Sequence, residues 1–555
     1  MKFRSAITLT SITLLLLIFP SVLGFNITSY KLLAGSSQLH DYGEHQMWNG
    51  FVNAPLSRNI FYGKLHAELC KLILQAASSS ETLTVLATYN KNLSRDDIVA
   101  RIQSKVEVAQ IIFTSNHVPT IILRLPAEEI HLLEEVNGIN YIFADQEVKL
   151  YHDKLALIDF YKLQRETVNQ PSLYLNESSK IMGADRLWRL GVDGRGVYLA
   201  VIDSGVNWTH PDLVGKVVFS ASFVPYEDPM DYFGHGTHVA GIAAGTGAAS
   251  QGRFRGMAPG AYIINVKVFD RNGTANLLWI LQAFEALLTM NLPIHVVLMC
   301  WGTYPLPESH PLNLYMAEFA KRNITLVAAA GNQAYYWTVG SPANSPYVIS
   351  VGASTKDDRL AFFTSKGPDP YTMRTLPLIT APGVNVIAPI SGALTQYSLS
   401  ENPYYAKLSG TSMAAAHAAG AIALLLSAFP YASPNAIKAA LLLSVEDIGY
   451  DVNAMGAGRI NVYKAYEILS RRVAFAAFHP KAITGFEAPF IACFPGDVDF
   501  FNITILTSTS ISNARLAVTG NVSQIFFIKH LELGSVSGSA FIWANITISE
   551  EAQVG

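Results

Sequence analysis

The sequence predicts an α/β protein whose centre is a doubly wound, mostly parallel sheet. Three observations support this fold class. Residues 195–205 form an apolar run that ends in Asp203 and a glycine, as expected for a buried parallel strand. From residue 262 to residue 330, apolar strands alternate with helices. The connections between these strands are long enough for the crossovers that parallel strands require.

Residues 1–24 are predicted to be a signal peptide. Lys2 and Arg4 precede a short apolar run, and small residues suited to signal peptidase follow Pro20. The alternative is an uncleaved membrane anchor, but the apolar run is short for crossing a bilayer. No other segment is predicted to span a membrane in the mature form. Residues 25–81 form an N-terminal segment of uncertain structure.

Residues 82–150 are predicted to form a small α+β unit. Strands are expected at 83–89, 110–114, 120–125 and 140–148, and helices at 95–106 and 127–136. This βαββαβ order is that of a ferredoxin-like fold. The residues alone are compatible with any small binding domain.

The larger domain that follows is expected to continue the alternation of strands and helices. Further strands are predicted at 262–268, 294–299, 325–330, 347–351 and 384–388, and helices at 277–290, 312–322 and 433–443. After residue 471 the helical pattern ends. Segments rich in β-branched and aromatic residues at 497–507, 514–518, 525–528 and 539–548 then predict a β-sandwich-like C-terminal region.

Three glycine-flanked stretches carry candidate catalytic residues. Asp203 ends its strand, and His235 opens the stretch Gly-His-Gly-Thr-His. Ser412 lies in Ser-Gly-Thr-Ser-Met-Ala, directly before a run of small residues that predicts a buried helix. A helix N-terminus favours the negative charge that develops around a nucleophilic serine. The chain order Asp, His, Ser is one of the known orders of a catalytic triad.

These motifs resemble those of the subtilisin-like serine proteases, the subtilase family. Ala-Ala-Gly-Asn at 329–332 is a fourth match, and its Asn332 occupies the family's oxyanion-hole position. Further matches at 210–213, 363–367, 381–383 and 456–461 extend the resemblance over about residues 180–465. The resemblance implies a subtilisin-like catalytic domain at 180–470 and a serine endopeptidase that acts on proteins or peptides.

The resemblance also implies a role for each catalytic residue. Ser412 would attack the substrate carbonyl and form an acyl-enzyme, His235 would accept its proton, and Asp203 would orient the imidazole. The Asn332 amide and the Ser412 N–H would form the oxyanion hole. No cofactor is required for this chemistry. His238 and His417 lie in the same motifs and are expected to serve packing and hydrogen bonding.

Two neighbouring regions resemble parts of subtilase precursors. The unit at 82–150 resembles the family's propeptide, which assists folding and inhibits the enzyme with its tail in the active-site cleft. Residues 151–179 would then be a linker containing or near the maturation site, and the cut is expected between about residues 144 and 179. Residues 471–555 resemble the β-rich accessory domains that follow some catalytic domains.

The predicted substrate-binding strand departs from the family pattern. Cys300, Trp301 and Gly302 stand where the family usually has Ser-Leu-Gly. Extended peptides pair with the backbone of this strand, which the changes leave intact. Trp301 would either reshape the adjoining subsites or serve as a core or rim aromatic, and the sequence leaves both interpretations open. Cys300 is expected to be a buried small residue. Ala416 replaces a usual proline, with a minor expected effect.

The composition is that of an exported globular protein of 555 residues. The net charge of −3 gives no indication of a nucleic-acid partner, and three cysteines exclude a disulfide framework. Glycosylation sequons begin at Asn26, Asn92, Asn176, Asn207, Asn272, Asn323, Asn502, Asn521 and Asn545. They favour a secreted or cell-surface glycoprotein.

The family resemblance also allows a structural calcium ion. Acidic residues are available at Asp228, Asp231, Asp357 and Asp358, but no spaced ligand loop stands out. Most of these acids are expected to be solvated surface groups. No metal ligand is assigned from the sequence.

Two other function classes would account for parts of this pattern. A catalytically silent subtilisin-like protein that binds peptides would retain the fold, but the intact set of Asp203, His235 and Ser412 argues against it. A dinucleotide-binding oxidoreductase is excluded because no Gly-x-Gly-x-x-Gly follows the first strand.

Overall fold

The computed structural model describes residues 61–76, 81–150, 167, 172–471 and the backbone of five strands between residues 476 and 547. By its contacts the chain divides into Met1–Asn53 and Ala54–Gly555, and the described residues all belong to the second unit. The predicted signal peptide, the first part of the N-terminal segment and most of the linker at 151–179 lie outside the described residues.

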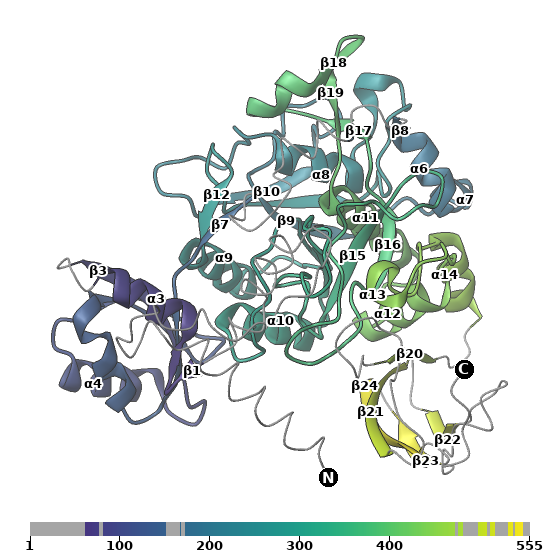
Figure 1. Ribbon diagram of the computed structural model, residues 1–555. Helices are drawn as coiled ribbons and strands as arrows, with labels where there is room; N and C mark the ends of the chain where they lie inside the picture. The colour runs from purple at the N-terminus through teal and green to yellow at the C-terminus, as the bar shows by residue number, and fades with distance from the viewer. Residues whose placement is uncertain are drawn as a thin grey trace, which may run out of the picture. The chain divides into compact units, whose positions relative to one another are not determined.

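A seven-stranded parallel sheet forms the centre of the large domain (Figure 1). Its strand order is β10-β11-β9-β13-β14-β15-β16, and each neighbouring pair is parallel. The strands are β9 (Tyr198–Asp203), β10 (Val217–Ser222), β11 (Tyr262–Lys267), β13 (Val296–Met299), β14 (Thr325–Ala329), β15 (Val348–Ser354) and β16 (Ile379–Pro382). The predicted doubly wound parallel sheet is therefore confirmed. The strand order reverses at β9, which is where open α/β sheets place their binding sites.

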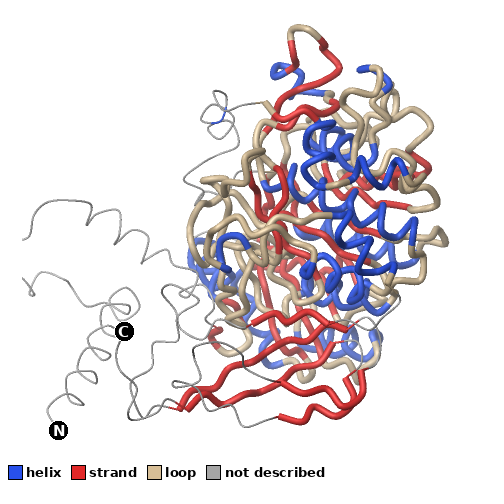
Figure 2. The backbone as a smooth tube through the Cα atoms, turned by 90° about the vertical axis from the view of Figure 1, so that its right-hand side faces the viewer, coloured by secondary structure: helices blue, strands red, loops and turns tan. Residues whose placement is uncertain are grey.

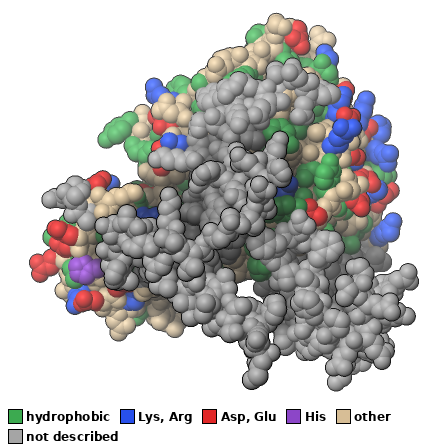
Figure 3. Space-filling model, viewed as in Figure 1, with side chains coloured by type: hydrophobic (Ala, Val, Ile, Leu, Met, Phe, Trp, Pro, Cys, Tyr) green, Lys and Arg blue, Asp and Glu red, His purple; other side chains and the backbone are tan. Residues whose placement is uncertain are grey.

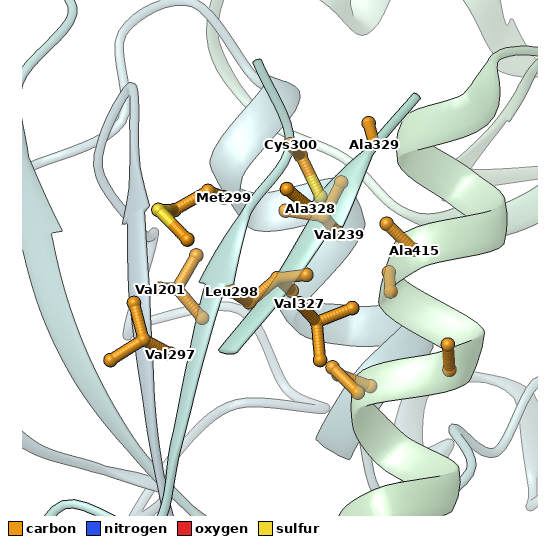
Figure 4. Packing of buried hydrophobic residues seen from close by; sticks show 14 of the residues in the cluster. Val201, Val239, Val297, Leu298, Met299, Cys300, Val327, Ala328, Ala329 and Ala415 are labelled. Atoms are coloured by element: carbon orange, nitrogen blue, oxygen red, sulfur yellow. The ribbon is translucent and has the colours of Figure 1, made fainter. Parts of the chain in front are cut away.

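Four helices accompany this sheet: α8 (His235–Ala244), α9 (Leu277–Thr289), α10 (Pro311–Lys321) and α11 (Thr411–Ala428). Figure 2 shows helices packed around the strands of this domain. Helix α11 packs against α8 and against β13 to β16, and Figure 4 shows Ala415 of α11 beside side chains of β13 and β14. Helix α10 packs against α9 and β14.

The close approach of α11 to its neighbours depends on small residues. A Cβ atom at Gly420 would lie 2.5 Å from Cβ of Met257 and 2.7 Å from the carbonyl oxygen of Ala243. Among the described residues, α11 is the one helix long and apolar enough to cross a membrane, and 89% of its apolar window is buried inside the protein. It therefore has the burial of a core helix.

A second sheet has the order β18-β19-β17-β8. It contains β8 (Leu173–Tyr174), β17 (Val386–Pro389), β18 (Ser398–Leu399) and β19 (Asn402–Leu408). The strand predicted at 384–388 belongs to this sheet and not to the parallel one, because β17 pairs antiparallel with β19. Shorter helices complete the domain: α6 (Leu175–Met182), α7 (Ala184–Arg189), α12 (Pro434–Leu443), α13 (Val452–Met455) and α14 (Val462–Ser470).

The N-terminal α+β unit has a six-stranded sheet of order β1-β2-β6-β3-β5-β4. Its elements are β1 (Phe61–Tyr62), β2 (Leu65–His66), α3 (Ala67–Ala76), β3 (Thr82–Tyr89), α4 (Arg95–Lys105), β4 (Gln110–Thr114), β5 (Thr120–Pro126), η2 (Ala127–Glu135) and β6 (Ile139–Ala144). The helix predicted at 127–136 is η2, a 3-10 helix. Strands β1 and β2 and helix α3 lie in the segment for which the sequence predicted no structure.

The last strand predicted for this unit, at 140–148, is divided in two. Strand β6 ends at Ala144, and β7 (Glu147–Lys149) pairs with β12 (Thr274–Asn276) of the large domain. Asp145 lies at the break, where its Oδ1 accepts a hydrogen bond from the Leu278 N–H at 3.2 Å. The chain therefore leaves one sheet at Asp145 and joins a strand of the other domain.

The two faces of the N-terminal sheet are buried against different partners. Val85, Ala87 and Ile121 belong to a hydrophobic cluster within the unit itself. Leu86, Ile122 and Phe143 belong to the cluster that forms the core of the large domain. Because successive strand residues point to opposite faces, one face packs on the unit's own helices and the other on the large domain.

The C-terminal region contains five described strands. Strands β20 (Ala476–Pro480), β21 (Val498–Thr507) and β24 (Ser539–Thr547) form an antiparallel sheet, and β22 (Ile511–Leu516) pairs with β23 (Leu531–Val536). The strand predicted at 525–528 lies outside the described residues. In the part of the surface that Figure 3 colours, charged side chains of both signs are interspersed, in keeping with the small net charge.

Candidate active site

Asp203 and His235 form a direct hydrogen-bonded pair. The distance from His235 Nδ1 to Asp203 Oδ1 is 2.7 Å, and both side chains are buried. Asp203 is the last residue of β9, and its Oδ1 also accepts the Ser204 N–H at 2.8 Å. His235 is the first residue of α8. The carboxylate thus fixes the ring orientation and leaves Nε2 as the nitrogen that can exchange a proton.

Ser412 lies in the first turn of α11, which packs against the helix that carries His235. Its hydroxyl donates a hydrogen bond to the Cys300 carbonyl at 2.9 Å. Catalysis would require this hydroxyl to pass its proton to a base, and the His235 imidazole on the adjoining helix is the candidate for that role. The free N–H groups of the first helical turn favour negative charge at this position.

Thr411, the residue before Ser412, holds the Asn332 side chain beside the serine. The Asn332 Oδ1 accepts the Thr411 N–H at 2.9 Å and the Thr411 hydroxyl at 3.0 Å. With the oxygen fixed in this way, Nδ2 is the group that can donate to an oxyanion. Gly331, at φ +114, makes the turn that follows β14, and a Cβ there would lie 2.7 Å from the Ser365 hydroxyl oxygen.

One pocket brings most of the predicted site residues together. Ser412, Asn332 and the strand segment from Cys300 to Gly302 all line it. The remaining lining residues are Lys149, Thr303, Ala329, Ala330, Gly331, Gln333, Thr338, Gly340 and Thr411. Lys149 belongs to the N-terminal unit, and it was not among the site residues expected from the sequence.

Trp301 points away from the substrate side of its strand. Its side chain is 4% exposed, and the indole N–H donates to the Ile202 carbonyl at 2.8 Å. Its ring lies near those of Phe269 and Phe284. These contacts favour the interpretation of Trp301 as a core aromatic that supports the strand ending in Asp203. The neighbouring Cys300 is buried, as expected. Burial raises the pKa of its thiol well above the ordinary value.

Asp231 is a hydrogen-bonding centre that the sequence analysis missed. It is 2% exposed, so it is the exception among the four acids, most of which were expected to be solvated surface groups. Its Oδ1 accepts the Ser204 hydroxyl at 2.9 Å and the Gly234 N–H at 2.7 Å, while Oδ2 accepts the Thr237 N–H at 2.8 Å and hydroxyl at 2.6 Å. Asp231 therefore connects the start of α8 to the residue after Asp203. An acid four positions before the histidine was the available signal.

Lys267 is a second buried charge behind the site. It is fully buried on β11 and pairs in register with Asp203. Its Nζ donates to the Ser204 and Phe269 carbonyls, each at 2.7 Å, and lies 3.3 Å from a Glu227 carboxylate oxygen. A lysine at the end of a mostly apolar strand gives little indication of this role from sequence alone.

The two other motif histidines are buried and hydrogen-bonded. His238 Nε2 lies 3.2 Å from the Ala406 carbonyl, and burial lowers its pKa to about 3. His417 bonds to the Met413 carbonyl and the Ser178 hydroxyl, and burial lowers its pKa to about 4. Both are therefore neutral at physiological pH, in keeping with a packing role.

The remaining candidate calcium ligands do not gather. Asp228 and Asp357 are exposed, while Asp358 makes two hydrogen bonds to the Arg459 guanidinium. Within the described part of the chain, no group of three or more His, Cys, Asp or Glu side chains could hold a metal ion.

Comparison with known proteins gives a consistent result. The family model described as "Subtilase family" matches residues 194–459. The serine protease AprX of Bacillus subtilis is 35% identical, over 54% of this chain and 75% of that protein. Subtilisin E of the same species is 34% identical, over 51% of this chain and 68% of that protein. The membrane-bound transcription factor site-1 protease of Mus musculus is 28% identical, over 60% of this chain and 32% of that protein.

Replacing Asp231 by alanine should destabilise the large domain. The change leaves Ser204, Gly234 and Thr237 without their acceptor, and each lost bond to a charged group is worth roughly 1.5–3 kcal/mol. We therefore expect a clear fall in the urea midpoint of the large-domain transition. The exposed Asp228→Ala should shift that midpoint little, within about 0.5 kcal/mol. Equal midpoints for the two variants would show that Asp231 does not organise this region.

Proposed function

Because the chain belongs to the subtilase family of serine endopeptidases, we propose that Asp203, His235 and Ser412 are its catalytic triad. The observation that carries this proposal is the 2.7 Å contact between buried Asp203 and His235, with Ser412 on the adjoining helix. Ser412 attacks the carbonyl of a peptide bond as His235 Nε2 takes its proton. The imidazolium, held by Asp203, then returns the proton to the leaving amine.

The negative charge on the substrate oxygen is met by two donors. These are Nδ2 of Asn332 and the backbone N–H of Ser412 at the start of α11. The substrate backbone pairs with the segment from Cys300 to Gly302, which lines the same pocket. Water then attacks the resulting acyl-enzyme, with the same histidine as base and the same two donors at the substrate oxygen.

The N-terminal unit acts as an inhibitory propeptide in this proposal. Its β4–β5 turn contacts Glu285 of α9, which accepts the Ser115 hydroxyl at 2.7 Å and the Asn116 N–H at 2.9 Å. Glu285 also accepts the Tyr315 hydroxyl within the large domain. Asp145 caps the start of the same helix, and burial raises its pKa to about 6. The unit is thereby held at both ends of α9, with its tail leading toward the Ser412 pocket.

The remaining assignments complete the picture of an exported precursor. Residues 1–24 direct secretion and are removed, 82–150 form the propeptide, 151–179 form the linker, 180–470 form the catalytic domain, and 471–555 form a β-rich accessory domain. Sequons support glycosylation outside the cell. Calcium, if bound, has a structural role and takes no part in the chemistry.

Self-processing is the first consequence to test. The wild-type precursor should lose its N-terminal unit during refolding, and the Ser412→Ala precursor should not, because only the hydroxyl can form the acyl-enzyme. Intact mass measured over time distinguishes the two. Cleavage of both precursors at the same rate would show that another protease acts on the chain.

The oxyanion hole predicts the effect of a second substitution. Asn332→Ala should lower kcat by about 10²–10³, the loss found for the corresponding asparagine of a subtilisin, and should leave KM nearly unchanged. Initial rates on a peptide substrate measure both constants. The exposed Asp357→Ala is the control and should retain wild-type kcat. A change confined to KM would assign Asn332 to ground-state binding.

The propeptide contacts predict a weaker complex when they are removed. Glu285→Ala, in the large domain, should raise the dissociation constant between the cut N-terminal unit and the large domain by about tenfold or more. Ser115→Ala, which removes the partner hydroxyl in the N-terminal unit, should also raise it. Gel filtration of the processed but unseparated protein at falling concentration measures this. Glu318→Ala, on the outer side of α10, is the matched control. Unchanged co-elution in both test variants would contradict the proposed inhibitory contact.

A further inference from the structure

Lys267 is a fully buried cation at the end of β11, the strand beside the one that ends in Asp203. The two residues are paired in register, so their side chains leave the sheet on the same face. The pairing continues beyond the strands, because the Asp203 carbonyl accepts the Val268 N–H at 2.9 Å and the Phe269 N–H at 3.3 Å. The register therefore places the ammonium and the carboxylate side by side at the same edge of the sheet.

Ser204 connects the two charges. Its carbonyl accepts a hydrogen bond from Lys267 Nζ at 2.7 Å, and its N–H donates to Asp203 Oδ1 at 2.8 Å. Lys267 Nζ also donates to the Phe269 carbonyl at 2.7 Å, so the ammonium is held from two sides. The positive charge is thereby fixed in position relative to the carboxylate that orients His235.

The Asp203 carboxylate has few other groups that stabilise its charge. Its Oδ1 accepts the His235 Nδ1–H at 2.7 Å and the Ser204 N–H. In the part of the chain that the structure describes, Oδ2 is buried and accepts no hydrogen bond. A buried carboxylate favours its protonated form unless donors or an opposite charge compensate. The neighbouring ammonium therefore stabilises the ionised form of Asp203.

Glu227 offsets part of this positive charge from the other side. One of its carboxylate oxygens lies 3.3 Å from Lys267 Nζ, and its side chain is 9% exposed. The other oxygen accepts the Arg271 Nε–H at 3.2 Å, from a side chain that is 63% exposed. Lys267 and Glu227 can therefore be neutralised one at a time, with opposite effects on the local charge.

The other titratable groups near the pair contribute little variable charge. His238 of α8 and His417 of α11 are neutral near physiological pH, because burial lowers their pKa values to about 3 and about 4. Burial raises the pKa of the Cys300 thiol, after β13, well above its ordinary value, so it too is neutral. Asp231, before α8, has donors on both oxygens. Lys267 and Glu227 are thus the groups whose removal should change the charge that faces the triad.

We propose that Lys267 is a positioning residue of the triad: its ammonium keeps Asp203 ionised and opposes protonation of His235, and so extends activity to lower pH. The inference rests on the proposed function of the triad and adds the group that controls its charge state. His235 must be neutral to take the proton of Ser412, so activity is lost when falling pH protonates it.

Two single variants should move the acid limb of the pH profile in opposite directions. Lys267→Met removes the positive charge, which makes protonation near Asp203 and His235 easier, so the acid midpoint of kcat/KM should rise by about 0.5–1 pH unit. Glu227→Gln leaves the ammonium without its carboxylate partner, so the midpoint should fall by a similar amount. The kcat/KM on a peptide substrate, measured with mature enzyme from the full-length precursor over about pH 4–9, reports ionisation of the free enzyme.

Arg271→Gln is the matched control. It removes the same unit charge as Lys267→Met, but from an exposed side chain that solvent and salt screen, so its midpoint should stay within about 0.2 pH unit of wild type. Thermal unfolding of each variant measures its stability separately. A purely structural role for Lys267 would lower the melting temperature without opposite shifts of the pH profile.

The double variant K267M/E227Q keeps the question open to test if Lys267→Met does not fold. It removes both charges of the buried pair together, and its acid midpoint should lie above that of Glu227→Gln and close to that of wild type. Equal midpoints for Glu227→Gln and the double variant would contradict the proposal even without the single lysine variant.

The outcomes separate the two proposals. Unchanged midpoints, or shifts in the same direction for Lys267→Met and Glu227→Gln, in an enzyme that digests casein, would overturn the inference alone. Absence of casein hydrolysis by a folded and processed wild-type enzyme would instead overturn the proposed function, and the inference with it.

Discussion

The site depends on the parallel arrangement of the central strands. Parallel strands end at the same edge of a sheet, so the residues that follow β9, β13 and β14 must lie near one another. Asp203, Cys300 and Asn332 come from these three ends, and α11 brings Ser412 to the same edge. Antiparallel pairing of any one of these strands would move its residue to the opposite edge of the domain. The chemistry is therefore a consequence of sheet topology before it is a consequence of particular side chains.

Buried charges secure this arrangement at the point where the chain turns. Asp231 joins the start of α8 to Ser204, and Lys267 holds the Ser204 and Phe269 carbonyls. Each charge is fully hydrogen-bonded in the low-dielectric interior, where an unpaired polar group would strongly destabilise the fold. Both charges bind Ser204, the residue that follows Asp203, and so they hold the chain where it leaves the strand that carries the carboxylate.

The sequence was sufficient to predict features that depend on local pattern. Apolar runs located β9, β11 and β14, and the small residues after Ser412 predicted α11. Features that depend on distant partners were not predictable in this way. The strand expected at 384–388 lies in another sheet, because its partner is β19, a later segment of the chain. The strand expected at 140–148 is divided at Asp145, because its second half pairs with the distant strand β12. The burial of Asp231 depends likewise on Ser204 and Ser391, which lie far from it in the sequence.

The N-terminal sheet carries apolar residues on both of its faces, and only one face is covered by its own helices. Leu86, Ile122 and Phe143 are buried by the large domain. In the proposed maturation, cutting the chain and releasing the unit would expose these side chains to water over a continuous surface. A small domain in that state has lost part of the free energy that keeps it folded, and local opening makes it accessible to proteolysis. The released unit would then be short-lived in the presence of the enzyme that it is proposed to restrain, and activation would be irreversible without any further component.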